Sequence, residues 1–77
     1  MNENELIRII GHNIKKYRLN KKTTIEKLSE ITNLSNSYIY KLENQNTNIN
    51  ISINNLYKIA TVLEVPISKF FEYEENN

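Results

Sequence analysis

Most of the side chains in this sequence that could bind a partner are positively charged, and they are unevenly distributed along the chain. Seven basic residues lie between Arg8 and Lys27 against a single acid, whereas the segment from Lys41 to the end holds three basic residues and five acids. Such a basic cluster attracts anions, nucleic-acid phosphates among them. The formal net charge is only +1, and exposed helices are commonly charged, so this asymmetry alone fits a solvated surface equally well.

Residues needed for catalysis or for metal binding are scarce. The sequence has no Cys, one His and one Gly, and all nine of its acidic residues are Glu. It therefore lacks a thiol nucleophile, a thiolate metal site and a glycine-rich loop that cradles phosphates. We expect no enzyme activity, no cofactor, no metal and no small-molecule ligand, and we expect His12 to be a surface residue.

A second set of side chains, which can hydrogen-bond to a partner, follows Ser35. Amide, hydroxyl and ammonium groups that can hydrogen-bond the edges of bases are carried by Asn36, Ser37, Tyr40 and Lys41. If this segment is a helix whose Ser35, Ile39 and Leu42 face the core of the protein, these four side chains and that of Asn44 face outward. A solvated helix face explains the same pattern, and without further information it is the better interpretation.

The elements that must position these residues are all helical. Apolar periodicity predicts an all-α single domain over residues 1–77, with a core at about 5–72 and a frayed tail at 74–77. The predicted segments are 5–19, 25–32, 35–44, about 52 to Pro66, and 66–72. No apolar run approaches the ~20 residues that span a bilayer, and the polar, acidic start differs from a signal peptide. We expect a soluble, cytoplasmic protein.

One face of each long helical segment is apolar. The residues expected to face the core are Ile7, Ile10, Ile14, Tyr17, Leu28, Ile31, Leu56, Ile59, Ala60 and Leu63. We expect Thr23 or Thr24 to cap the second segment and Ser35 to cap the third. Pro66 is expected in the first turn of the fifth, where its fixed φ suits a helix.

The second and third segments are joined by a very short connection. Asn33 is the best candidate for the positive φ that such a turn needs. Ser29 is small enough for two helices to cross closely, and Leu34 is expected to fill the corner between them. These features are typical of a helix-turn-helix.

Residues 24–44, TIEKLSEITNLSNSYIYKLEN, resemble the helix-turn-helix of the Cro/repressor family, also called the XRE family. Residues 10–18 resemble the first helix of that family, residues 56–65 resemble its fourth, and the match covers about residues 9–72. The resemblance implies a compact five-helix bundle, a lambda-repressor-like DNA-binding domain, and a transcription regulator that binds a palindromic operator in double-stranded DNA. Such a regulator is associated with the nucleoid when it is bound to DNA.

The sequence departs from the family pattern at a few positions. Ile25 replaces the Gln that usually opens the second helix and anchors a phosphate, and Asn33 and Gln45 replace two glycines. The longer loop before the fourth helix and the ending Phe70-Phe71-Glu72 resemble the controller proteins of restriction-modification systems. The missing Gln also leaves an alternative open, which is a protein-interaction module or antitoxin of the same fold.

The resemblance assigns roles to the polar residues. Base contacts are expected from Asn36, Ser37, Tyr40 and Lys41. Contacts to the DNA backbone are expected from Lys21, Lys22, Thr24, Tyr38, Asn44, Asn46, Thr47 and Asn48. Tyr38 has a second interpretation, which is packing beside the core. The family also pairs an Arg at the end of its first helix with a Glu at the end of the third, here Arg18 and Glu43.

One monomer of this type reads too few base pairs to be selective, so we expect a homodimer. Apolar residues near the C-terminus exceed what so small a monomer leaves exposed. The expected interface residues are Val62, Val65, Phe71 and Tyr73. Ile67 and Phe70 are expected either to join them or to close the core of the monomer.

Overall fold

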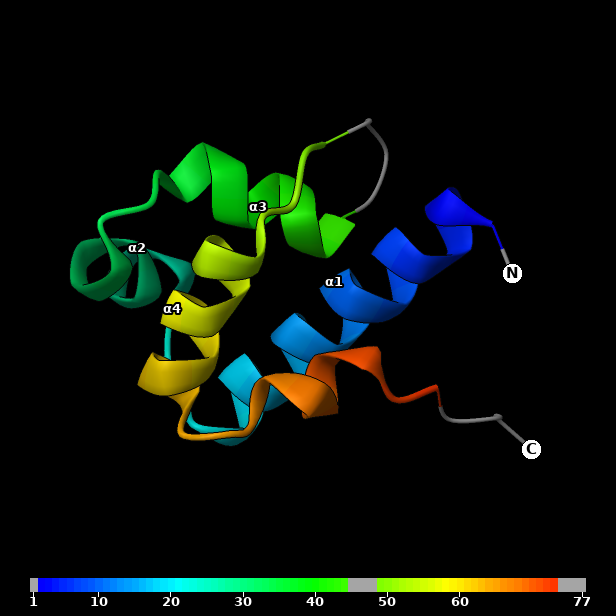
Figure 1. Cartoon of the computed structure of the whole chain (residues 1–77). Helices are drawn as coiled ribbons and strands as arrows, with labels where there is room; N and C mark the ends of the chain where they lie inside the picture. The colour runs from blue at the N-terminus through cyan, green and yellow to red at the C-terminus, as the bar shows by residue number, and fades with distance from the viewer. Residues whose placement is uncertain (1, 45–48, 74–77) are drawn as a thin grey trace.

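The structure, a computed structural model, describes residues 2–44 and 49–73, and all of the regular secondary structure in these residues is helical. The elements are α1 (Glu3–Asn20), α2 (Ile25–Thr32), α3 (Asn36–Asn44), α4 (Ile53–Leu63) and the 3₁₀ helix η1 (Ile67–Phe71). In Figure 1, α3 lies along one edge of the molecule and α1 crosses beside it, while α2 lies at the far end of α3 from the start of α1. The all-α prediction is confirmed.

The predicted count of five α-helices is wrong, because the last segment is a 3₁₀ helix. Pro66 has φ −63° but an extended ψ of 144°, so it precedes the helix and does not form its first turn. The amide of Lys69 donates to the carbonyl of Pro66 three residues back, which is the 3₁₀ spacing.

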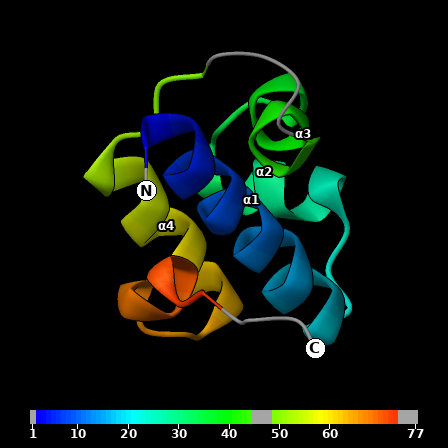
Figure 2. The same ribbon diagram turned by 90° about the vertical axis from the view of Figure 1, so that its right-hand side faces the viewer.

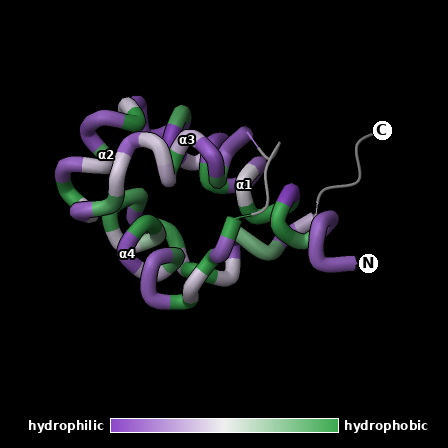
Figure 3. Tube along the Cα trace, turned by 90° about the horizontal axis from the view of Figure 1, so that it is seen from above, coloured by the Kyte–Doolittle hydropathy of each residue, from purple (hydrophilic) through white to green (hydrophobic). Residues whose placement is uncertain are grey.

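Polar side chains set the starts of the α-helices. Asn2 and Glu5 form a reciprocal capping box, which starts α1 two residues earlier than the apolar pattern predicts. Of the two candidates for α2, Thr24 is the N-cap, and its hydroxyl accepts from the amide of Lys27. Ser52 caps α4 in the same way. The hydrophobic and hydrophilic stretches that alternate along each helix are visible in Figure 3.

The core is built from every helix. Its fully buried large side chains are Ile14, Leu28, Ile39, Leu42, Leu56, Ile59 and Phe70. The prediction that Ile31 faces this core is wrong, because Ile31 is 54% exposed. The inward face of α2 is formed by Leu28 and Thr32 instead, and Thr32 satisfies its hydroxyl by donating to the carbonyl of Leu28 at 2.7 Å.

The turn between α2 and α3 has the predicted conformation. Asn33 has φ 62° and ψ 25°, in the left-handed region, and its amide donates to the carbonyl of Ser29 at 2.9 Å. The hydroxyl of Ser29 donates to the carbonyl of Leu34, and the amide of Leu34 donates to the hydroxyl of Thr32. Leu34 packs against the core. These bonds hold α2 and α3 at a fixed angle.

Candidate nucleic-acid interface

The polar residues of α3 share one exposed face. Asn36, Ser37, Tyr40 and Lys41 are all exposed, whereas Ile39, Leu42 and Glu43 on the opposite side are buried. The spacing of the exposed set, one helical turn between pairs, places its amide, hydroxyl and ammonium groups side by side. The surface so formed carries hydrogen-bond donors and acceptors of the kind that read base edges in the major groove.

Ser35 caps α3, as predicted, and its side chain does not face the core. It is exposed, and its hydroxyl accepts a hydrogen bond from the amide of Tyr38 at 3.0 Å. This bond satisfies one of the free amides at the start of α3, as expected of an N-cap residue. The inward face of α3 therefore begins at Ile39, with Tyr38 half-buried beside it.

A bidentate ion pair joins the end of α3 to α1. Nε of Arg18 donates to Oε2 of Glu43 at 2.7 Å, and Nη2 donates to Oε1 at 2.9 Å. The third guanidinium nitrogen, Nη1, donates to the carbonyl of Thr23 at 2.8 Å, so Arg18 also holds the connection between α1 and α2. The side chain of Glu43 is 1% exposed. Its hydrogen bonds raise the pKa of Arg18 above its ordinary value, against the opposing effect of burial.

Tyr38 lies in the second of its two predicted positions, packed against the core. Its hydroxyl donates to the carbonyl of Asn50 at 3.0 Å and accepts from Nδ2 of Asn55 at 3.1 Å. A phosphate oxygen can only accept hydrogen bonds, so Tyr38 would have to break the bond to Asn50 in order to bind one. In the structure Tyr38 ties α3 to the segment that leads into α4.

The residues predicted to contact the DNA backbone lie in different surroundings. Lys22 is exposed, whereas Lys21 forms an ion pair with Glu64, the residue that ends α4. The exposed hydroxyl of Thr24 accepts from the amide of Lys27 and keeps its own proton for a further hydrogen bond. The half-buried Asn44 donates to the carbonyl of Tyr40 at 2.7 Å. The predicted contacts of Asn46, Thr47 and Asn48 lie outside the described residues.

The start of α2 has no polar side chain at the position where the family usually has Gln. Ile25 is half-buried there and packs against the core. An anion at this end of α2 would therefore meet only the backbone amides of the first turn and the hydroxyl of Thr24.

The four residues predicted to form a dimer interface divide into two pairs. Val62 and Val65 are half-buried and pack against the core, so they offer less free surface than expected. Phe71 and Tyr73 are exposed, whereas Phe70 is fully buried and closes the core below α1.

Sequence reasoning did not identify Asn13, a buried polar residue of α1. Its Nδ2 donates to the carbonyls of Phe70 at 2.9 Å and of Glu72 at 2.8 Å. The signal was present, because Asn13 lies on the same helical stripe as Ile10 and Ile14. A polar residue inside an apolar stripe indicates a specific buried hydrogen-bond partner.

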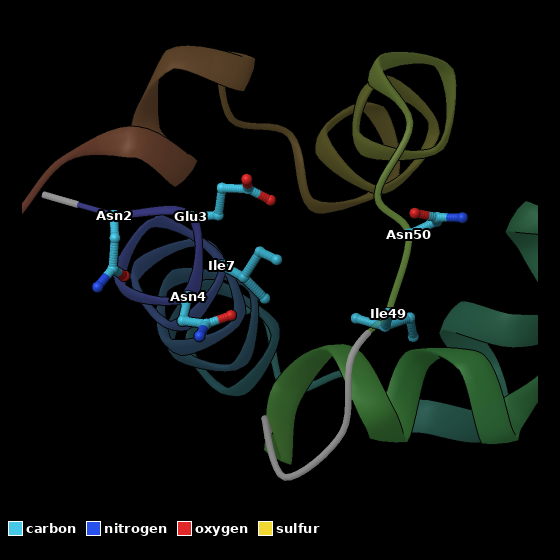
Figure 4. Close-up of a pocket in the computed structure, with 6 residues that line it drawn as sticks. All are labelled: Asn2, Glu3, Asn4, Ile7, Ile49 and Asn50. Atoms are coloured by element: carbon cyan, nitrogen blue, oxygen red, sulfur yellow. The ribbon is translucent and has the colours of Figure 1, made fainter.

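A cavity lies away from the exposed face of α3, between the start of α1 and residues 49 and 50. It has a volume of about 680 Å³ and is lined by Asn2, Glu3, Asn4, Ile7, Ile49 and Asn50. Figure 4 shows Glu3 and Ile7 extending from α1 toward the segment with Ile49 and Asn50. Glu3 is its only carboxylate. Among residues 2–44 and 49–73, no three His, Cys, Asp or Glu side chains gather where a metal ion could bind.

Comparison with known proteins identifies similar sequences and structures. A family model described as helix-turn-helix matches residues 14–70. The N-terminal DNA-binding domain of SinR from Bacillus subtilis is 30% identical, with a TM-score of 0.78 over 90% of this chain and 99% of that one. The structure of SinR, a master regulator for biofilm formation, in complex with DNA is 33% identical, with a TM-score of 0.74 over 82% and 98% of the two chains.

A third structure resembles the chain equally well. The restriction-modification controller protein C.AhdI from Aeromonas hydrophila is 26% identical, with a TM-score of 0.76, over 84% of this chain and 96% of that one. A comparison with curated proteins finds no match. No helix in the described part of the chain is long and apolar enough to cross a membrane.

Proposed function

The chain belongs to the helix-turn-helix family of XRE type, and we propose on this basis that it is a transcription regulator that binds a palindromic operator as a homodimer. The observation that carries the proposal is the exposed polar face of α3, held against α1 by the Arg18–Glu43 pair. The similarity to SinR, one structure of which is a complex with DNA, supports the same conclusion. We further propose that the protein is not an enzyme.

The exposed face of α3 enters the major groove in this proposal. Asn36 contacts adenine through its N6 and N7 positions, and Lys41 contacts guanine through O6 or N7. Ser37 acts as a donor or an acceptor, and the ring of Tyr40 contacts the methyl group of a thymine. A good base contact of this kind supplies ~1–3 kcal/mol of discrimination against the wrong base.

Contacts to the DNA backbone orient α3 without reading sequence. Lys22 and the free hydroxyl proton of Thr24 are placed beside the helix-turn-helix and are the described residues best suited to bind phosphates. Lys21 contributes less in this proposal, because Glu64 offsets its charge. We also retain Asn44, Asn46, Thr47 and Asn48 as proposed backbone contacts.

The dimensions of the protein suit a dimer on a palindrome. Two recognition helices that read successive faces of the major groove lie about 34 Å apart. The longest extent of the described chain is 32 Å. Two copies in direct contact are therefore of a size comparable with this spacing. The two halves of the operator would then be related by the same twofold axis as the protein.

The biological role proposed here is autoregulation, with activity set by protein concentration and operator occupancy. The similarity to C.AhdI supports a controller of a restriction-modification system as the specific role. A regulator of this kind acts where the DNA is, so we place the protein in the cytoplasm and at the nucleoid when it is bound.

A second candidate function is a protein-interaction module or antitoxin of the same fold. The observation that favours it is Ile25, which replaces a phosphate-binding side chain with a half-buried apolar one. Salt separates the two functions, because affinity for DNA falls steeply as salt rises, whereas a mostly apolar protein interface barely responds.

The experiment that tests the proposal is selection of bound sequences from a random duplex pool at near-physiological salt. Enrichment of an inverted repeat, with half-sites about one helical turn apart, is the expected result. If the protein is folded and no sequence is enriched, the DNA-binding proposal is wrong, and the protein-interaction function becomes the one to pursue.

A further inference from the structure

An apolar groove opens on the side of the molecule where α1 begins, and it includes none of the residues proposed to contact DNA. It has a volume of about 340 Å³, and its side chains include Leu6, Ile7, Ile53, Leu56 and Phe71. We call it the α1–α4 groove. Figure 2 looks onto this side, with the start of α1, the start of α4 and the end of η1 around it. Ile53 is 65% exposed and Phe71 is 40% exposed, so the groove leaves large apolar side chains in water.

The exposed ring of Phe71 projects from a backbone that is held on both sides. Asn13, only 3% exposed, uses its amide nitrogen to bind the carbonyls of Phe70 and Glu72, the two neighbours of Phe71. The ring of Phe70 is fully buried and anchors the same segment in the core. An apolar side chain on a pre-organised backbone loses less conformational entropy when a partner binds it. The fold therefore presents Phe71 in the manner of an interface anchor.

We infer that the α1–α4 groove is the surface on which a second copy of this chain docks, about a twofold axis. The inference rests on the proposed function, since it names the face that joins the two halves of the proposed operator-binding dimer. A twofold interface pairs one patch with itself, so the patch must be self-complementary. Apolar surface meets this condition, because it needs no opposite charge on the partner, and Glu3 is the only charged residue among the described residues that line the groove.

The position of the groove suits the same occupant. Figure 1 shows the C-terminal end of α3 on the same side of the molecule as the first turns of α1. A copy docked at the start of α1 therefore lies beyond one end of α3 and leaves the exposed face of that helix free. The longest extent of the described chain, 32 Å, is on the scale of the roughly 34 Å that separates two half-sites, so a side-by-side arrangement is compatible with this spacing.

A rival surface lies between α2 and α4 and is less suited to a second copy. Its lining residues are Ile31, Thr32, Tyr57, Lys58, Thr61 and Val62. Half of these are polar, and a twofold contact there would bring two Lys58 ammonium groups toward each other. Like charges brought together in an interface oppose association. Among the described residues each surface has one charged side chain, Glu3 or Lys58, but the residues that line the α1–α4 groove are mostly apolar, so we place the dimer there.

The test compares two glutamate substitutions at similarly exposed isoleucines. Ile53→Glu places a charge in the α1–α4 groove, and Ile31→Glu, at a position that is 54% exposed, places the same charge on the rival surface. Ile53 is the first residue of α4, where an acidic side chain is favourable to the helix, so the variant keeps its fold. Sedimentation of the full chain over a concentration series, with circular dichroism as the folding check, measures the dimer dissociation constant.

We expect Ile53→Glu to raise the dimer dissociation constant about 100-fold or more, because two buried charges replace two apolar contacts. Ile31→Glu is expected to leave it within about threefold of the starting protein. Phe71→Asp, which leaves Asn13 and its two bonds in place, is expected to repeat the effect of Ile53→Glu. If both groove variants dimerise as tightly as the starting protein, or if Ile31→Glu alone dissociates it, the groove is not the interface.

The failure of this inference is distinguishable from the failure of the proposed function. A protein that dimerises through the groove but enriches no DNA sequence overturns the operator-binding proposal and leaves the interface standing. A protein that enriches an inverted repeat but remains monomeric in free solution, with Ile53→Glu binding the repeat as tightly, overturns the interface and leaves the DNA-binding proposal standing.

Discussion

Replacing Glu43 with Gln tests whether the buried ion pair stabilises the helix-turn-helix. The substitution keeps the shape of the side chain and one carbonyl acceptor, but it removes the negative charge and one of the two acceptors of Arg18. The guanidinium then remains charged in a largely buried position, since its side chain is 10% exposed. Its hydrogen bond to the carbonyl of Thr23 is retained.

The expected loss follows from the burial of both partners. Removal of one partner from a buried ion pair costs about 3–5 kcal/mol, because the other charge is left uncompensated. The bond to Thr23 and the remaining acceptor on Gln reduce this, so we expect a loss of about 2–4 kcal/mol. In a domain of this size each kcal/mol lowers Tm by about 4–8 °C, which gives a decrease of about 8–32 °C.

Thermal and urea unfolding followed by circular dichroism measure this loss. The matched control is Glu30→Gln, which removes the exposed partner of Lys27 and should change stability by less than ~1 kcal/mol. A double variant, Arg18→Met with Glu43→Met, should recover part of the loss because it leaves no unpaired buried charge. If Glu43→Gln unfolds at the same temperature as Glu30→Gln, the pair does not stabilise the fold and our reasoning is wrong.

Three other substitutions test separate parts of the molecule. Asn36→Ala combined with Lys41→Ala should reduce operator affinity by more than 100-fold, since each lost base contact is worth ~1–3 kcal/mol, while the fold and the dimer stay intact. Unchanged affinity in a fluorescence titration would mean that α3 does not read bases in the major groove of DNA. Tyr38→Phe should cost about 1–2 kcal/mol of stability, since it leaves the carbonyl of Asn50 and the amide of Asn55 unpaired. A stability equal to that of the starting protein would mean that water replaces the hydroxyl. Asn33→Ala should destabilise by about 1 kcal/mol because φ is 62° there, and Asn33→Gly should not; equal unfolding midpoints for the two would contradict this.

Much of the fold was predictable because short-range features determine it. The apolar stripes placed all four α-helices, and the polar caps Thr24 and Ser52 begin two of them. The left-handed turn at Asn33 was also predictable, since few residues other than Gly adopt positive φ at low cost. Each of these depends on residues within one or two helical turns along the chain, and so it can be read from local sequence.

The errors arose where contacts between elements or the backbone conformation of a single residue decide the outcome. Ile31 was predicted to be buried, but α2 turns Thr32 inward and leaves Ile31 on the surface. The last helix was predicted as α-helical, but Pro66 is extended and the residues after it form a 3₁₀ helix. The candidate site was incomplete for the same reason. Asn13 donates to carbonyls 57 and 59 residues away; its place in an apolar stripe indicates a buried partner, but no local pattern identifies which one.

By itself, the sequence determined the class of the protein: its helices, the turn at Asn33, and the polar outer face of α3 all follow from local periodicity and backbone preference. The tertiary structure alone decided which polar groups are already occupied. Tyr38 gives its proton to Asn50, and Lys21 is paired with Glu64. The physical reason is that a hydrogen bond or an ion pair depends on distances of about 3 Å between atoms, and only packing sets those distances when the partners lie far apart in the chain.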